Sequence, residues 1–225
     1  IGAKGNDIVI TAGATEANNL AFSAVQDSEV LVLETEHASV LNLAKNYKYQ
    51  TIKVDKNGRI DLLDFQKKLT DKVGFVKKKL DSKVSFVSIS LANNELGTIQ
   101  PIAEIAEMIK AEKMTRLQAK NPLPLVFHSD ASQALNLLNI SVTRLGVDLM
   151  TINSAKVYGP KGVGALYVSP EIIKAKKIVP YIIGGGQEGG YRSGTENIVG
   201  IAGFGAAAAE GRASFSSNAA KMTAL

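Results

Sequence analysis

The stretch DLMTINSAKVYGPKGVGALYV, residues 148–168, contains two buried-strand patterns separated by a tightly specified turn. The near-continuous apolar runs at 148–153 and 163–168 are typical of strands covered on both faces of a sheet. Between them, Tyr158, Gly159 and Pro160 interrupt any regular strand or helix. Lys156 therefore stands where the first strand ends, in a backbone setting that a solvated surface lysine does not need.

Other runs predict further buried strands: DIVIT at 7–11, EVLVLE at 29–34, VSFVSISL at 84–91 and PLVFHSD at 124–130. Helical patterns lie between many of the strands, at 14–25, 38–47, 101–114 and 198–213. Strands that alternate with helices predict an α/β fold with a mainly parallel sheet and helices on both faces. The polar stretch 111–125 is expected to form the end of a surface helix and a loop.

Composition narrows the class of protein. The 225 residues, 45% of them hydrophobic, suffice for one domain with a buried core. Neither a membrane-spanning run nor a secretion signal is evident, so we expect a cytoplasmic protein without membrane partners. The net charge is +5, but the lysine groups at 77–79 and 174–177 are not interleaved with aromatic residues. They predict a solvated surface and no nucleic-acid partner.

The absence of cysteine excludes disulfides and cysteine-ligated metals, and two histidines are too few for a histidine-rich metal site. We therefore expect no metal. In open α/β sheets, ligands bind beyond the carboxyl ends of the strands. The polar residues that follow each strand are thus the candidates for function.

After the first strand, a turn at Gly13 leads into a helix whose start, with the Thr15 hydroxyl, could bind a phosphate. Read alone, Thr15 as a simple N-cap is the better interpretation. After the second strand, His37 could move protons or stack on a flat ligand, or it could cap and pack a helix. After the third strand, Asn93 and Asn94 could bind a polar group or build a turn.

Asp130 ends the fourth strand, and Gln133 follows three residues later. This carboxylate could bind a metal, cap a helix or pair with a protonated ring nitrogen. Lys156 could be a salt-bridged surface lysine or an amine nucleophile. The glycine-rich stretch 184–195, which includes Arg192, suits an anion or could be an ordinary loop. A phosphate site, a nucleophilic lysine and an acid beside a ring nitrogen together match the needs of pyridoxal 5′-phosphate.

Six stretches in this order carry a family resemblance: TAGATEANNLA (11–21), TEHASVL (35–41), NNELGTIQPI (93–102), HSDASQ (128–133), VDLMTINSAKVYGPKGVGALYV (147–168) and GGGQEGGYRSGTEN (184–197). The chain resembles the cysteine desulfurases, in the class-V aminotransferase group of pyridoxal-phosphate enzymes. The resemblance covers essentially the whole chain. It implies the large domain of a fold type I pyridoxal-phosphate enzyme.

The resemblance implies a catalytic and cofactor-binding role for several residues. Lys156 would bind the cofactor covalently as an imine. His37 would stack on the pyridine ring and assist proton transfer. Asp130 would pair with the ring nitrogen, and Gln133 would bond the phenolic oxygen.

The remaining implied contacts concern the phosphate, the substrate and a second subunit. Ala14 and Thr15 would hold the phosphate, and Asn94 would help to bind the substrate carboxylate. Thr195 would reach the phosphate of the partner subunit's cofactor, which implies a homodimer.

The chain departs from the family beside the lysine. The family usually has a serine and a histidine that contact the phosphate where this chain has Asn153 and Ala155. Asn153 can still donate a hydrogen bond, whereas Ala155 cannot. Ser154 could compensate as a cofactor-binding residue.

The implied reaction converts L-cysteine to L-alanine and leaves the sulfur on an enzyme cysteine, for iron–sulfur cluster or thio-cofactor assembly with a sulfur-acceptor or scaffold protein. That cysteine is absent from this chain. We therefore expect residues 1–225 to be a large domain that is incomplete at both ends and lacks the small C-terminal domain. The alternatives are another class-V aminotransferase-like enzyme and an inactive, cofactor-binding relative.

Overall fold

The computed structural model describes residues 1–25, 28–70, 83–120 and 123–224. Within these residues, the chain forms a seven-stranded sheet with the strand order β1-β7-β6-β5-β4-β2-β3. The strands are β1 (Ile8–Thr11), β2 (Glu29–Leu33), β3 (Lys48–Ile52), β4 (Val84–Ser88), β5 (Val126–Asp130), β6 (Leu149–Asn153) and β7 (Gly164–Val168). The helices are α1 (Ala14–Phe22), α2 (Ala38–Ala44), α3 (Leu62–Thr70), α4 (Ile102–Gln118), α5 (Val142–Leu145), α6 (Pro170–Lys174) and α7 (Ile198–Ala224).

The direction of the strands confirms the prediction of a mainly parallel sheet. Strands β2 to β6 pair in parallel, and only β7 runs antiparallel, to both β6 and β1. Because β7 is antiparallel to both of its neighbours, β1 points the same way as β6. The carboxyl ends of β1, β2, β4, β5 and β6 therefore meet at one edge of the sheet.

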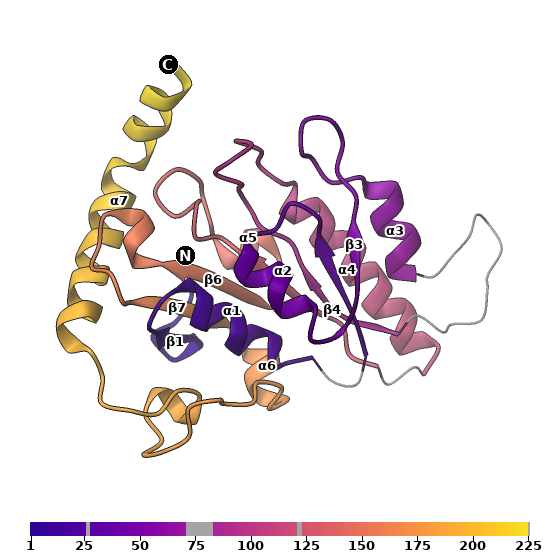
Figure 1. Cartoon of the computed structure of the whole chain (residues 1–225), viewed down its shortest axis with the longest axis horizontal. Helices are drawn as coiled ribbons and strands as arrows, with labels where there is room; N and C mark the ends of the chain where they lie inside the picture. Colours follow the sequence, from indigo (N-terminus) through magenta and orange to yellow (C-terminus); the bar gives the residue numbers. More distant parts are fainter. Residues whose placement is uncertain (26–27, 71–82, 121–122, 225) are drawn as a thin grey trace.

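Both faces of the sheet are covered, as the near-continuous apolar strands predict. Alternate residues of β2 belong to two different cores. Val30 and Val32 share one core with residues of α1, α2 and α6, whereas Leu31 and Leu33 share the other with residues of α3, α4, α5 and α7. Figure 1 shows α1 and α2 in front of the strands. Each such side chain contributes roughly 1.5–3 kcal/mol by its burial, so a polar substitution on either face would be costly.

The sequence patterns missed one strand and three helices. Strand β3 lies at the edge of the sheet, and its first three residues are exposed, so it lacks the apolar run by which the other strands were predicted. Helix α3 is amphipathic and buries only Phe65 and Leu69, which lie four residues apart on one face. Helices α5 and α6 have four and five residues, too few for a clear periodic pattern.

The stretch 111–125 is only partly the surface segment that its polarity predicts. Helix α4 continues to Gln118 and buries Glu112 and Arg116. The Arg116 guanidinium pairs with Glu112 at 2.8 Å and donates to the Val84 carbonyl at 2.7 Å. The charges are buried because each has a partner, which the composition of the stretch does not reveal.

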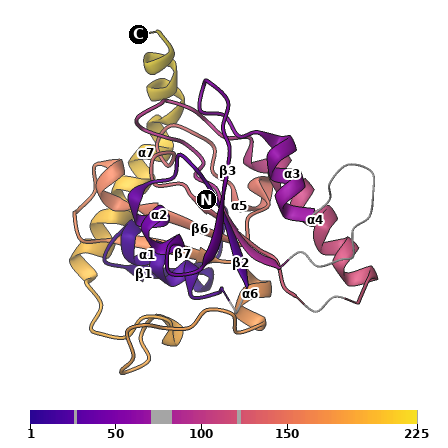
Figure 2. The same cartoon turned by 45° about the vertical axis from the view of Figure 1, so that its right-hand side comes forward.

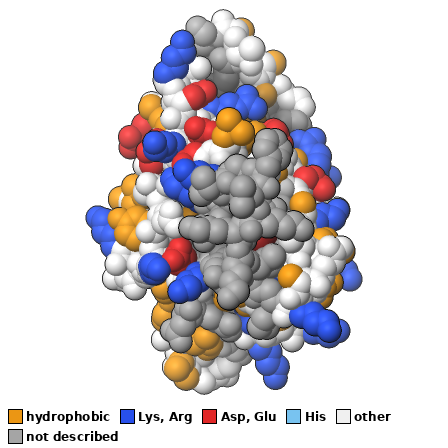
Figure 3. Space-filling view, turned by 90° about the vertical axis from the view of Figure 1, so that its right-hand side faces the viewer, with side chains coloured by type: hydrophobic (Ala, Val, Ile, Leu, Met, Phe, Trp, Pro, Cys, Tyr) orange, Lys and Arg blue, Asp and Glu red, His pale blue; other side chains and the backbone are white. Residues whose placement is uncertain are grey.

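One of the two lysine groups lies in the described part of the chain. Lys174 and Lys176, at the end of α6, are exposed. Figure 3 shows lysine and arginine side chains scattered over one face among acidic and neutral ones. The run at 77–79 lies outside the described residues.

Helix α7 is longer than predicted, because it continues from residue 213 to Ala224. Both views show its C-terminal part extending past the rest of the molecule (Figures 1 and 2). Among the described residues, no helix combines the length and apolar character that crossing a membrane requires.

Candidate active site

A cavity of about 250 Å³ lies at the sheet edge where five strands end. It is lined by residues that follow β1, β2, β4, β5 and β6, which is where ligands bind in open α/β sheets. Eight of the ten predicted site residues line this one cavity: Ala14, Thr15, His37, Asn94, Asp130, Gln133, Asn153 and Lys156.

The turn after β1 leaves backbone donors free at the start of α1. The N-cap is Gly13, which offers no side-chain bond, so the interpretation of Thr15 as the N-cap is wrong. The N–H groups of Ala14 and Thr15 have no partner among the described residues, and both residues line the cavity. A Cβ on Gly164 would lie 2.6 Å from the Gly13 carbonyl carbon, so β7 requires glycine beside this turn. The result is an anion site made of backbone N–H groups.

His37 caps α2 and lines the cavity, so its interpretation as a helix cap is confirmed. Its role in moving protons or stacking on a flat ligand stays a prediction. The Ser39 backbone N–H donates to His37 Nδ1 at 3.1 Å, and Ser39 Oγ lies 2.8 Å from the same nitrogen. Because the backbone N–H can only donate, Nδ1 accepts, and the ring proton is assigned to Nε2. The cap therefore fixes both the tautomer and the orientation of the ring.

Asp130 is almost fully buried at the end of β5. Its Oδ1 accepts from the Ser132 backbone N–H at 2.9 Å, and its Oδ2 accepts from Asn18 Nδ2 at 2.9 Å. A carboxylate oxygen can accept more than one hydrogen bond, so Asp130 retains capacity for a ring N–H. The described residues contain no cluster of three or more His, Cys, Asp or Glu able to hold a metal ion.

Glu36 also lines the cavity and is 5% exposed. Its Oε1 accepts from the Ser90 backbone N–H at 2.5 Å, and its Oε2 has no hydrogen-bond partner among the described residues. Burial, together with the nearby negative charge of Asp130, raises the pKa of Glu36 from 4.5 to about 8, although the Ser90 bond opposes this. At neutral pH Glu36 is therefore mainly uncharged, and less negative charge faces an anionic ligand.

Of the two adjacent amides after β4, Asn93 is confirmed as a turn residue, whereas the ligand-binding role of Asn94 stays a prediction. Asn93 builds the turn: its Oδ1 accepts from the backbone N–H groups of Glu95 and Leu96. Asn94 instead accepts from Gln133 Nε2 at 3.1 Å across the cavity. The Asn94 side-chain N–H₂ group is left to donate to a ligand.

Lys156 lies on a short 3₁₀ turn, Ser154–Val157, which follows β6 directly. No ion pair to its amine occurs within the described part of the chain, so the interpretation as a salt-bridged lysine is wrong. The turn ends at Tyr158, whose φ of 62° lies in the left-handed region. The Asn153 Oδ1 accepts from the Ala155 N–H at 3.3 Å, which leaves the Asn153 amide nitrogen free to donate.

Two predicted residues do not line this cavity. Ser154 is fully buried, and its Oγ has no hydrogen-bond partner in the described part of the chain. It packs against Gly159, where an added Cβ would come within 2.3 Å of that oxygen. Thr195 is exposed on the loop before α7. Its contact with a partner subunit's cofactor stays a prediction.

The glycine-rich loop before α7 offers less to an anion than its composition indicates. The Arg192 guanidinium pairs with Glu16 at 3.0 Å, next to the phosphate-site residue Thr15. The Glu188 Oε2 accepts from the Ile10 N–H on β1 at 2.8 Å. These contacts hold the loop against β1 and α1. The Arg192 guanidinium is paired with Glu16 and is therefore less available to an anion.

His128, the second histidine of the chain, belongs to the core. It is fully buried, with Ser88 Oγ 2.8 Å from Nδ1 and Thr151 Oγ1 3.0 Å from Nε2. Burial lowers the pKa of His128 to about 4, although the charge of Asp130 opposes this. The ring is therefore neutral at physiological pH and stacks on Phe86.

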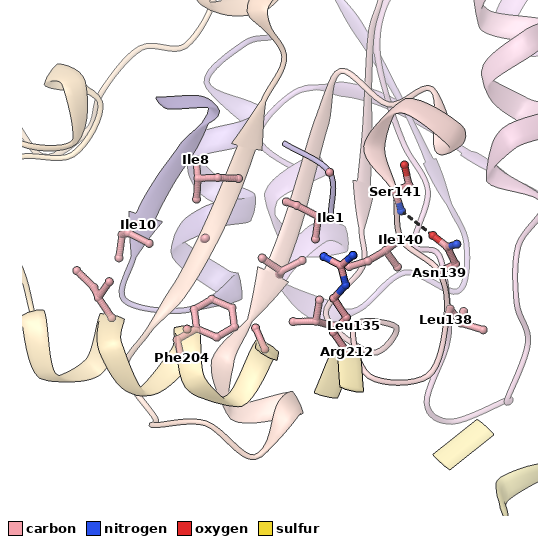
Figure 4. Close-up of a pocket in the computed structure, with 16 residues that line it drawn as sticks. Ile1, Ile8, Ile10, Leu135, Leu138, Asn139, Ile140, Ser141, Phe204 and Arg212 are labelled. Carbon is pink, nitrogen blue, oxygen red and sulfur yellow. Dashed lines mark hydrogen bonds between the residues drawn. The ribbon is translucent and has the colours of Figure 1, made fainter. Parts of the chain in front are cut away.

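A larger hollow of about 760 Å³ lies elsewhere, between β1, α7 and the 135–141 segment. Aliphatic side chains of Ile8, Ile10 and Leu135 point into it, with Phe204 and Arg212 from α7 (Figure 4). It contains none of the predicted site residues. The smaller, more polar cavity is therefore the candidate active site.

The sequence patterns did not single out the polar residues behind the cavity. Asn18, Glu36, Ser39 and Ser90 support or line it. Glu36 could have been noted, since it directly precedes His37 after a buried strand. Asn18 gave no such signal, because α1 also carries the polar residues Glu16 and Asn19 close by.

Residues 1–222 match the family described as aminotransferase class-V. The chain belongs to the class-V aminotransferase family. Cysteine desulfurase IscS 1 of Archaeoglobus fulgidus is 41% identical over 219 residues, which are 92% of this chain and 50% of that protein. The mitosomal cysteine desulfurase of Encephalitozoon cuniculi is 34% identical over 223 residues, 92% of this chain and 46% of that protein.

Solved structures of the family share the fold. The NifS-like protein of Rickettsia africae has a TM-score of 0.79 at 35% identity and aligns with 94% of this chain and 52% of its own. The protein SspA in complex with cysteine has a TM-score of 0.74 at 31% identity and aligns with 92% of this chain and 56% of its own. This class-V aminotransferase chain thus spans about half the length of the relatives it matches. The resemblance to cysteine desulfurases and the fold type I prediction are confirmed.

Proposed function

We propose that this chain carries the pyridoxal 5′-phosphate site of a cysteine desulfurase. The observation that carries the proposal is the placement of the Lys156 amine in one cavity with Asp130, His37 and the free N–H groups of α1. These groups come from four different strand ends, so their meeting depends on the whole sheet. The names of the relatives support the same activity.

The residues present fit this cofactor. The N–H groups of Ala14 and Thr15 suit its phosphate, and the Asn153 amide nitrogen adds a donor nearby. Ala155 offers no side-chain donor. When bound, pyridoxal 5′-phosphate supplies an electron sink for a carbanion formed at the substrate. The phosphate would therefore rest mainly on the backbone of α1.

The side chains around the cavity have separate tasks. The Lys156 amine would hold the cofactor through its aldehyde carbon, and Asp130 would accept from its ring N–H. His37 would cover a ring face and present Nε2–H as a proton carrier. Gln133 Nε2 carries two hydrogens, one of which is donated to Asn94 Oδ1. The other would be donated to the phenolic oxygen of the cofactor. Asn94 donates to the substrate carboxylate.

Residues 1–225 contain no cysteine that could accept the sulfur of the substrate. In the proposed reaction the C–S bond of L-cysteine breaks, the sulfur forms an S–S bond with an acceptor thiolate, and the carbon gains a proton. The products are L-alanine and a persulfide. We propose that residues 1–225 are the large domain of a longer protein that supplies the acceptor cysteine and passes sulfur to a partner protein.

Two finer parts of the proposal concern assembly and location. The exposed position of Thr195 is compatible with a contact to a second subunit, and we propose a homodimer on this basis. The cytoplasm is the proposed location, in line with the bacterial relatives named IscS, although other relatives are mitosomal.

The test uses the visible absorbance of bound pyridoxal 5′-phosphate. The wild-type chain should develop a yellow band that Lys156→Ala loses, while Lys161→Ala, on the next turn, keeps it. With L-cysteine and a small thiol, we expect L-alanine and persulfide in equal amounts. A band that Lys156→Ala leaves unchanged would refute the assignment. Conversion of an added 2-oxo acid to an amino acid would favour an aminotransferase instead.

A further inference from the structure

Asn18 on α1 is fully buried behind the cavity and has no role in the predicted site. Its Nδ2 donates two hydrogen bonds, to Asp130 Oδ2 at 2.9 Å and to Ser39 Oγ at 2.9 Å. Asp130 ends β5, whereas Ser39 follows β2 on α2. One amide nitrogen on α1 therefore joins two walls of the cavity.

The direction of these bonds follows from the chemistry of the groups. An amide nitrogen only donates, so Ser39 Oγ accepts from Asn18 and its own hydrogen is left for His37 Nδ1, 2.8 Å away. A flipped Asn18 amide would place its oxygen against the Asp130 carboxylate, which is repulsive. The observed orientation leaves Asn18 Oδ1 buried, with no hydrogen-bond partner among the residues that the structure describes. Both amide hydrogens of Asn18 are thus hydrogen-bonded, whereas its side-chain carbonyl is not.

We propose that Asn18 is a positioning residue that fixes Asp130 and His37 relative to each other. The inference rests on the proposed function. Through Asp130, Asn18 acts on the edge of the ring, where the ring nitrogen donates. Through Ser39 and His37, it acts on the face of the ring. The effect through Asp130 can be measured separately from the effect through His37, because only the former depends on the ring nitrogen.

The experiment compares two ligands, pyridoxal 5′-phosphate and its 1-deaza analogue, in which C–H replaces the ring nitrogen. Dissociation constants are measured by equilibrium dialysis for the wild type, Asn18→Leu, Ser39→Ala and Asp130→Asn. Asn42→Leu, the same change at an exposed position on α2, is the matched control. Asn18→Ala replaces Asn18→Leu if the larger side chain prevents folding.

The ratio of the two dissociation constants is the decisive readout. A hydrogen bond to a charged group corresponds to about a tenfold preference for pyridoxal 5′-phosphate in the wild type. Asn18→Leu should lower this preference to near that of Asp130→Asn. Ser39→Ala should weaken both ligands equally and keep the ratio, and Asn42→Leu should change neither. A merely structural role for Asn18 would weaken both ligands by the same factor, and that result overturns the proposal.

A second measurement needs no cofactor. In the ¹⁵N-labelled chain, both side-chain amide hydrogens of Asn18 should exchange slowly with water. Ser39→Ala should shift the resonance of one hydrogen, and Asp130→Asn that of the other. Rapid exchange of both overturns the proposal. If the wild type binds neither ligand, the proposed function fails together with this inference, whereas an unchanged ratio in Asn18→Leu removes the inference alone.

Discussion

Replacing Glu36 by glutamine should remove a pH-dependent loss of stability. Glu36 is buried beside Asp130, and its pKa is raised from 4.5 to about 8. The folded chain therefore holds a proton on Glu36 that the unfolded chain releases above pH 4.5. This contribution to stability is fully present below pH 4.5, declines as the pH rises toward 8, and is constant above that.

The magnitude follows from the size of the shift. One pKa unit corresponds to about 1.4 kcal/mol, so the shift from 4.5 to about 8 costs roughly 5 kcal/mol at pH 8 relative to pH 4. Between pH 5 and pH 8 the change is about 4 kcal/mol. Glutamine keeps an oxygen to accept from the Ser90 N–H but cannot ionise. The amide can change the free energy of unfolding, but by the same amount at every pH, so it does not affect the slope with pH.

The assay is urea denaturation followed by circular dichroism at half-unit steps from pH 5 to pH 8, without added cofactor. The free energy of unfolding of Glu36→Gln minus that of the wild type should rise by about 4 kcal/mol across this range. Glu210→Gln, at an exposed position on α7, should give a flat difference. An equally flat difference for Glu36→Gln would refute the account of the buried acid.

Three further substitutions test the packing of the fold, both beside the site and away from it. Gly164→Ala places a Cβ 2.6 Å from the Gly13 backbone, so thermal unfolding should show a loss of about 2 kcal/mol, with weaker pyridoxal 5′-phosphate binding by dialysis. Arg116→Leu leaves Glu112 buried and unpaired, and urea titration should show a loss of about 3–5 kcal/mol, most of it recovered when Glu112→Leu is added. Tyr158→Asn relieves a left-handed φ of 62° at a ring that is 95% exposed, and should raise the unfolding free energy by about 1 kcal/mol. No recovery in the double variant, or lower stability in Tyr158→Asn, would contradict these interpretations.

The sheet could be predicted from the sequence because most of its strands are buried on both faces. Runs such as those of β4 and β7 have every residue buried, so their apolar character is continuous. Strand β3 escaped prediction because hydrogen bonds to one neighbour hold it at the edge, with polar residues exposed. Local pattern therefore identifies the interior of a sheet better than its boundary.

The candidate site could be predicted in outline because the strands share one direction. Polar residues after parallel strands meet at one edge, and this placed Lys156 and Asp130 together. The hydrogen bonds and ion pairs around the cavity depend instead on packing between distant segments. The Asn18–Asp130 bond spans 112 residues, and the Arg192–Glu16 pair spans 176. Neither leaves a local signal, so the network behind Asp130 and the engagement of Arg192 could be seen only in the folded chain.

The central claim is that Lys156 is the residue that binds pyridoxal 5′-phosphate covalently. The most direct measurement is to load the chain with the cofactor, reduce with sodium borohydride, digest it and locate the modified lysine by mass spectrometry. The account predicts the reduced phosphopyridoxyl group on the peptide containing Lys156, and its absence when excess inorganic phosphate competes for the start of α1. Modification spread over exposed lysines such as Lys174, or no modification of Lys156, would contradict it.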